Sequence, residues 1–161
     1  MSNYAVLIAA RMTSGRLHGK VLAELWPRRG AGVLEQIVRR WQSSVRSPQV
    51  VVSCPDTAEN EAIAGVASRL GIQCYRGHPT DVLAQLDGAL RAFAPDARWI
   101  ARGMADNPLV DVGLADWRLD VLAETGADGL WYPSDPGNTR ITYAGVTDVW
   151  SRAAWDRIVE N

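Results

Sequence analysis

The feature that most constrains this chain is the alternation of short apolar runs with segments of helical periodicity. Residues 4–10 form the first run, which is almost entirely apolar and therefore typical of a strand covered on both faces. Residues 33–44 follow, with apolar side chains at helical spacing. This order, repeated with short connections, predicts an α/β fold with a mainly parallel sheet and helices on both faces.

The same patterns assign the remaining segments. Further strands are expected at residues 49–53, 72–75, 99–101, 129–132, 141–143 and 146–150. Further helices are expected at residues 59–70, 81–93, 114–124 and 151–160. The best loop candidates are residues 133–139 and 27–32, which are rich in proline and glycine.

Residues at the expected helix ends predict local geometry. Asp56 followed by Glu59 forms an acidic variant of the capping box before the helix at 59–70. Gly71 follows the last apolar position of that helix, where a left-handed cap needs no Cβ. Asp81 is expected to cap the next helix.

Size and charge exclude some classes of protein. The 161 residues suffice for one domain with a core, and the formal net charge of −1 argues against a nucleic-acid binder that relies on bulk positive charge. No apolar stretch could span a bilayer, and the first residues lack the basic character of a signal peptide, so we expect a cytoplasmic protein without membrane insertion. Cys54 and Cys74 lack metal-ligand spacing and are expected to be buried free thiols.

Cations and glycines follow the first expected strand directly. Ligands of open parallel sheets bind beyond the carboxyl ends of the strands. There, Arg11, Arg16 and Lys20 alternate with Gly15 and Gly19. Glycine lets backbone N–H groups approach an anion closely, and the cations neutralise its charge. From these residues alone, the segment is either a phosphate site or a solvated basic loop.

Other strand ends also carry polar residues. Ser53 could hydrogen-bond a base edge or simply begin a turn. Asp106 would face the cationic loop, as a carboxylate that holds Mg²⁺ against a triphosphate must, but taken alone this segment favours the simpler interpretation that Asp106 organises an Asn-Pro turn. His18 and His78 are interpreted as exposed loop residues, because no nucleophile lies near either of them in the sequence.

Three motifs in order, "ARMTSGRLHGKVL", "YRGHPTDVL" and "ARGMADNPLVD", together resemble one family. They are similar to the signatures of cytidylyltransferases of the spore coat polysaccharide biosynthesis type, relatives of acylneuraminate and CMP-Kdo synthetases. The later segment "ITYAGVTDVWSRAAWDRI" resembles that family more loosely. The resemblance extends from about residue 4 to the end.

The resemblance implies a Rossmann-like, three-layer nucleotide-diphospho-sugar transferase fold with a mainly parallel mixed sheet. A single nucleotidyltransferase-like domain would span residues 1–161. It would join a nucleoside triphosphate, most simply CTP, to a sugar acid or modified sugar and release pyrophosphate, with Mg²⁺ as cofactor. The product would serve surface polysaccharide biosynthesis.

The family's functional positions carry over residue by residue. The resemblance implies that Arg11 and Lys20 act in catalysis on the triphosphate. Asp106 would hold the metal, and Asp148 would be a second metal ligand if the register shifts by one residue. The nucleotide-binding positions are Ala9, Ala10, Arg11, Ser14, Arg16, Lys20, Ser53, Arg76, Asp81 and Arg102.

Some positions depart from the family's pattern. Thr13 replaces a glycine that could need a positive φ, His18 replaces a proline, and Thr147 stands where an aspartate is usual. We also expect the chain to lack the family's C-terminal segment, which contributes to sugar recognition and to dimer contacts; a homodimer is a further expectation.

These departures leave two alternatives open. One is a catalytically impaired nucleotide-binding or scaffolding domain of this fold. The other is a glycosyltransferase that uses a finished nucleotide sugar, against which the cationic loop argues.

Overall fold

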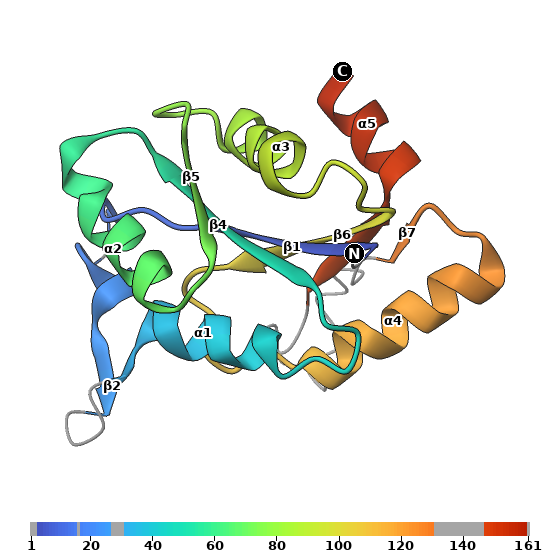
Figure 1. Ribbon diagram of the computed structural model, residues 1–161, viewed down its shortest axis with the longest axis horizontal. Helices are drawn as coiled ribbons and strands as arrows, with labels where there is room; N and C mark the ends of the chain where they lie inside the picture. Colours follow the sequence, from blue (N-terminus) through green and yellow to red (C-terminus); the bar gives the residue numbers. More distant parts are fainter. Residues whose placement is uncertain (1–2, 16, 27–30, 131–146, 161) are drawn as a thin grey trace.

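A six-stranded mixed sheet forms the centre of the molecule (Figure 1). The computed structural model describes residues 3–15, 17–26, 31–130 and 147–160. The parallel strands are β1 (Tyr4–Ala9), β4 (Gln49–Pro55), β5 (Gln73–Gly77) and β6 (Trp99–Met104). Strand β8 (Asp148–Ser151) runs antiparallel to β6, and β7 (Gly129–Leu130) runs antiparallel to β8. The order β5-β4-β1-β6-β8-β7 confirms the expected mainly parallel mixed sheet.

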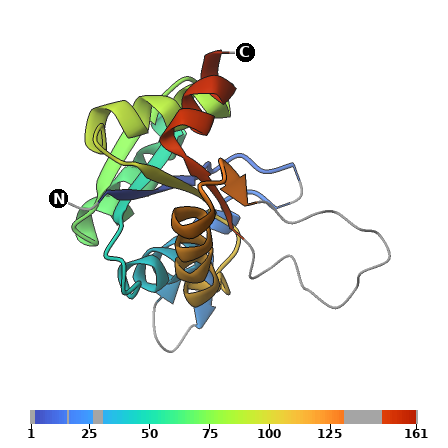
Figure 2. The ribbon, with the colours of Figure 1, turned by 90° about the vertical axis from the view of Figure 1, so that its right-hand side faces the viewer.

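Helices cover both faces of this sheet, which gives the three expected layers (Figure 2). One face packs against α1 (Val33–Gln42), α2 (Glu61–Arg69) and α4 (Val112–Thr125). The other face packs against α3 (Val82–Phe93) and α5 (Arg152–Glu160). Among the described residues, no helix is long and apolar enough to cross a membrane.

Strand β1 supplies both halves of the core. Tyr4, Val6 and Ile8 point into the larger cluster, and Ala5 and Leu7 point into the cluster beneath α3 and α5. All five are at most 2% exposed. The continuous apolar run in the sequence therefore reflects burial on both faces of the sheet.

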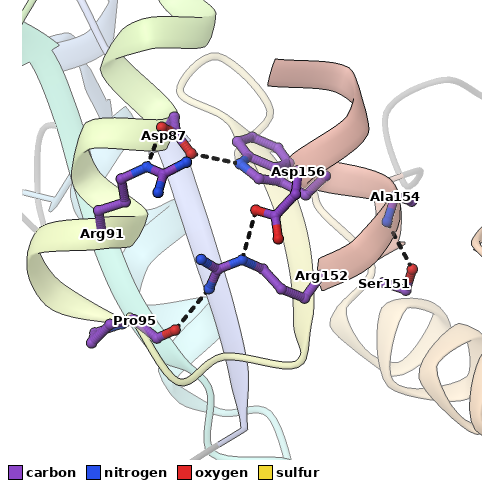
Figure 3. A network of polar contacts seen from close by, with 8 residues as sticks. Asp87, Arg91, Pro95, Ser151, Arg152, Ala154 and Asp156 are labelled. Carbon is purple, nitrogen blue, oxygen red and sulfur yellow. Dashed lines mark hydrogen bonds and ion pairs between the residues drawn. The ribbon is translucent and has the colours of Figure 1, made fainter. Parts of the chain in front are cut away.

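A network of polar contacts fastens α5 to α3 (Figure 3). The indole N–H of buried Trp155 donates a 3.2 Å hydrogen bond to Asp87, whose other carboxylate oxygen accepts from Arg91 at 2.6 Å. Arg152 donates to the carbonyl of Pro95 at 2.7 Å. Asp87 is thus a buried carboxylate whose two oxygens both have donors, as burial requires.

Two thiols meet across neighbouring strands. Cys54 on β4 is buried, whereas Cys74 on β5 is half-buried, so the expected burial is right for the first and only partial for the second. Their sulfur atoms lie 3.9 Å apart. The hydrogen bond between them raises the pKa of Cys54 and lowers the pKa of Cys74.

Most expected elements are present, with differences at short segments. Residues 27–32 were expected as a loop, but Ala31–Gly32 forms β3, which pairs with β2 (Glu24–Trp26). Helix α4 begins at Val112, two residues early, because Asp111 caps it by accepting from the N–H of Leu114 at 3.0 Å. The expected strand at 141–143 and loop at 133–139 lie outside the described residues.

Helix ends follow two of the three capping expectations. Gly71 has φ +68° and Asp81 accepts from the N–H of Ala84 at 2.9 Å, which confirms both. The prediction of a capping box at Asp56 is wrong. A 3-10 turn, Ala58–Asn60, precedes α2, and the N-cap residue of this turn is Thr57, whose side chain makes no capping hydrogen bond. Asp56 instead pairs with Arg76 at 2.9 Å, a partner that local spacing does not reveal.

Gly88 sets how closely α3 approaches β5, and this leads to a first prediction. A Cβ at Gly88 would lie 2.7 Å from Cε1 of Tyr75, whereas a Cβ at Gly65 of α2 would meet nothing within 4 Å. Gly88→Ala should lower the free energy of unfolding by about 1–3 kcal/mol, because the aromatic ring must move. Gly65→Ala, the matched control, should raise it by up to about 1 kcal/mol. Urea unfolding measures both, and equal effects would contradict the packing described.

Candidate active site

A pocket of about 470 Å³ opens at the carboxyl ends of β1 and β6. Its wall includes Arg11, Lys20, Arg102 and Asp106, together with Gln85 from α3. Three cations and one carboxylate therefore meet where the sheet topology directs ligands. The combination suits an anion that carries a divalent metal.

The loop after β1, residues 10–19 apart from the undescribed residue 16, is closed by specific hydrogen bonds. The N–H of Gly19 donates to the carbonyl of Met12 at 2.9 Å, and Gly19 has φ +68°, which favours glycine. The N–H of Met12 donates to Oδ1 of Asn60 at 2.9 Å. Lys20 is the first residue of a short 3-10 turn (Lys20–Leu22). Its side chain therefore extends from a backbone that these hydrogen bonds hold in place.

An ion pair joins this loop to the loop after β6. Nζ of Lys20 lies 2.6 Å from Oδ2 of Asp106, although the two residues are 86 positions apart. Asp106 is the third residue of a turn, residues 104–107, in which the N–H of Asn107 donates to the carbonyl of Met104 at 3.2 Å. Neighbouring parallel strands end side by side, and this brings the two loops together.

A second ion pair lies on the adjoining strands. Arg102 of β6 and Asp148 of β8 stand opposite each other in the register, and Nη2 of Arg102 lies 2.8 Å from Oδ2 of Asp148. The carbonyl of Thr147 accepts a 2.6 Å hydrogen bond from buried Arg118 of α4. Burial lowers the pKa of the Arg118 guanidinium. The buried Arg118 side chain therefore holds the backbone directly before Asp148.

The structure brings most of the predicted site residues together. Seven of them line the pocket: Ala9, Ala10, Arg11, Ser14, Lys20, Arg102 and Asp106. Asp148 adjoins the pocket through its ion pair with Arg102 and does not line it. The predicted residue Arg16 lies outside the described residues.

Three other predicted residues, Ser53, Arg76 and Asp81, are not part of the pocket lining. Ser53 is fully buried on the α3 face of the sheet, where its hydroxyl has no hydrogen-bond partner within the described part of the chain. Arg76 forms ion pairs with Asp56 and Glu61, and the hydrogen bond to Glu61 raises its pKa. Asp81 caps α3. Arg76 and Asp81 therefore have structural partners, whereas Ser53 has none for its hydroxyl within the described part of the chain.

The departures in the loop after β1 fit without strain. Among the described residues only Ser47 has a positive φ without being glycine, so Thr13 occupies an ordinary conformation. Thr13 lines the pocket wall itself. Nε2 of His18 lies 3.3 Å from Oε1 of Glu59, which joins the loop to the 3-10 turn that precedes α2. Position 13 therefore has no positive φ that would favour glycine.

Asn60 and His78 have roles that the sequence patterns did not indicate. Asn60 is 2% exposed; it accepts from Met12 and donates to the hydroxyl of Thr57 at 2.7 Å. It fell inside the helix expected at 59–70, so no local signal marked it. His78 is exposed, as expected, but its Nδ1 accepts from the N–H of Asp81 at 2.9 Å and so supports the start of α3.

The bond from Met12 to Asn60 yields a second prediction. Asn60→Ala should lower the free energy of unfolding by about 1–3 kcal/mol, because buried partners lose their hydrogen bonds. It should also speed amide hydrogen exchange in residues 11–15, measured by mass spectrometry. Asn60→Asp keeps the accepting oxygen and should leave exchange in that segment close to wild type. Unchanged exchange in the alanine variant would contradict the anchoring role.

Comparison with known proteins identifies the family. The cytidylyltransferase family model matches residues 5–149. The spore coat polysaccharide biosynthesis protein SpsF of Bacillus subtilis is 29% identical over 137 residues, which are 84% of this chain and 56% of that protein. The 3-deoxy-manno-octulosonate cytidylyltransferase of Tolumonas auensis is 33% identical over 130 residues, 78% of this chain and 47% of that protein.

A solved structure agrees in fold. The structure of a cytidylyltransferase from Leptospira borgpetersenii aligns with a TM-score of 0.85 at 19% identity, covering 99% of this chain and 65% of that one. This chain spans about half the length of the curated relatives it matches. The match to the family model over most of the sequence shows that the chain belongs to the cytidylyltransferase family.

Proposed function

We propose that this protein is a Mg²⁺-dependent cytidylyltransferase that joins CTP to a sugar acid or modified sugar and releases pyrophosphate. The observation that carries the proposal is the pocket in which Arg11, Lys20 and Arg102 meet Asp106. Membership of the family supports cytidine as the base. The activity would take place in the cytoplasm and would serve surface polysaccharide biosynthesis.

The cations would bind and orient the triphosphate. Arginine offers a planar fork that matches phosphate oxygens, and lysine offers a mobile point charge. Arg11 begins the loop after β1 and Lys20 follows that loop, and both line the pocket, so they would bind the same phosphate chain. They would stabilise the charge that builds up on pyrophosphate as an oxygen of the sugar attacks the α-phosphorus.

The donor set also fits a hard divalent cation. Mg²⁺ is commonly held by one or two carboxylates, with substrate phosphates and water as its other ligands. Asp106 lines the pocket beside the cations, and Asp148 adjoins it. The described residues contain no group of three or more acidic, histidine or cysteine side chains that could hold a metal, so the nucleotide would complete the coordination. When bound, Mg²⁺ neutralises phosphate charge and polarises the reacting phosphorus.

The remaining parts of the substrates would occupy the rest of the pocket. Ala9 and Ala10 line the pocket at the end of β1 with small side chains, and the cytosine base would bind beside them. A sugar acid as acceptor is supported by the relative from Tolumonas auensis, a 3-deoxy-manno-octulosonate cytidylyltransferase. A homodimer stays a prediction.

A third prediction tests this function. Asp106→Asn should reduce Mg²⁺-dependent pyrophosphate release from CTP and a sugar acid by at least about 10²-fold, because a neutral amide holds the metal weakly. Asp111→Asn, the same change five residues along, should keep activity close to wild type, because asparagine also caps a helix well. A coupled phosphate assay over a panel of sugars and the four common nucleotides measures both variants.

The same measurements separate the alternatives. Calorimetric titration with CTP should show binding that strengthens with Mg²⁺. CTP binding without pyrophosphate release for any sugar would instead support an impaired nucleotide-binding domain. Stronger binding of a finished nucleotide sugar than of CTP would support a glycosyltransferase, and either result would overturn the proposal.

A further inference from the structure

Both carboxylates assigned to the metal already have a cation partner. Lys20 lies 2.6 Å from Asp106, and Arg102 lies 2.8 Å from Asp148. Lys20 and Arg102 also line the pocket in which the triphosphate would bind. Each of these cations therefore has two competing anionic partners: a protein carboxylate now and a phosphate when the nucleotide arrives.

The pair between Lys20 and Asp106 can open without movement of the backbone. The loop below Lys20 is fastened by Gly19 to Met12 and by Met12 to Asn60. The segment after Asp106 is fastened by Arg40, which donates to the carbonyl of Val110 at 2.8 Å. The lysine side chain has four rotatable bonds and so can exchange partners by rotation alone.

Exposure makes the pair weak enough to exchange. The side chain of Lys20 is 29% exposed and that of Asp106 is 39% exposed. Ion pairs that reach solvent contribute little net free energy, so a stronger anion can displace Asp106 from Lys20. A triphosphate carries several negative charges and presents them at the same wall of the pocket.

We propose that Lys20 holds the place of the divalent cation at Asp106 in the nucleotide-free protein, and that the triphosphate vacates this place by drawing Lys20 onto itself. The inference rests on the proposed function, because it assigns nucleotide and metal to this pocket. While Lys20 stays on Asp106, a metal ion alone must compete with an ammonium group for the carboxylate. Once Lys20 turns to the phosphates, Asp106 is released.

Linkage makes the effect reciprocal. If nucleotide binding frees Asp106 for the metal, metal binding must free Lys20 for the nucleotide by the same factor. The pair thus favours joint occupancy of the pocket by nucleotide and metal over occupancy by either one. Removing Lys20 should strengthen binding of metal alone, and removing the charge of Asp106 should strengthen binding of nucleotide alone.

The first test measures Mn²⁺ binding in the absence of nucleotide, from the electron paramagnetic resonance signal of free Mn²⁺. Lys20→Gln should bind Mn²⁺ about three- to tenfold more tightly than wild type, because Asp106 has lost its competitor. Lys20→Met, a second neutral variant, guards against a folding defect of the first. Arg11→Gln removes a charge from the same pocket without releasing Asp106 and should change the affinity by less than about twofold. Adding Asp106→Asn to Lys20→Gln should abolish the gain.

The second test measures CTP binding with EDTA present, by calorimetry. Asp106→Asn should tighten metal-free binding in the wild-type background, because Lys20 becomes available to the phosphates. In the Lys20→Gln background, Asp106→Asn should tighten CTP binding clearly less. The difference between the two backgrounds measures the coupling between Lys20 and Asp106, separately from the general repulsion between Asp106 and the triphosphate.

The outcomes separate this inference from the proposed function. Equal Mn²⁺ affinity in wild type and both Lys20 variants, or a gain as large in Arg11→Gln, overturns the inference even if the enzyme is active. A gain in Mn²⁺ affinity that needs Asp106 supports the exchange at the metal site. Absence of CTP binding by wild type with Mg²⁺ overturns the proposed function and the nucleotide half of the exchange.

Discussion

The burial of β1 between two parallel neighbours is the constraint on which the rest of the molecule depends. Hydrogen bonds to β4 on one side and β6 on the other fix its register, and its side chains supply the core on both faces. The loops that leave β1 and β6 must then emerge together at one edge. The meeting of Lys20 and Asp106, distant in the sequence, is a direct product of this pairing.

Periodicity was enough to predict the long elements and the sheet edge at which the pocket opens. It failed for β2 and β3, because strands of three and two residues are too short to show an alternating pattern. The rule that ligands bind beyond strand ends selected the segments that carry Arg11, Lys20, Arg102 and Asp106, and these four residues line one pocket, although Arg102 lies within β6 because that strand continues to Met104. Family resemblance then gave these residues their expected roles.

The sequence patterns could not predict which way side chains point or which distant residues they contact. Every residue of β4 from Val50 to Pro55 is buried, so no polar alternation told which face Ser53 would take. Asp56 resembled a helix cap because spacing in the sequence reveals only local partners. In the structure, Asp56 instead forms an ion pair with Arg76 of the neighbouring strand β5. Asn60 could not be identified as the anchor of the loop after β1, because its partner lies 48 residues away.

The buried bond from Arg118 to the carbonyl of Thr147 has an evolutionary consequence. It fixes the chain from α4 immediately before β8, so the position of Asp148 depends on the core and on β6. Changes in the length or composition of the connection between β7 and β8 could therefore accumulate without displacing that carboxylate. One stretch of a gene can thus diversify while the charged pocket beside the sheet stays intact.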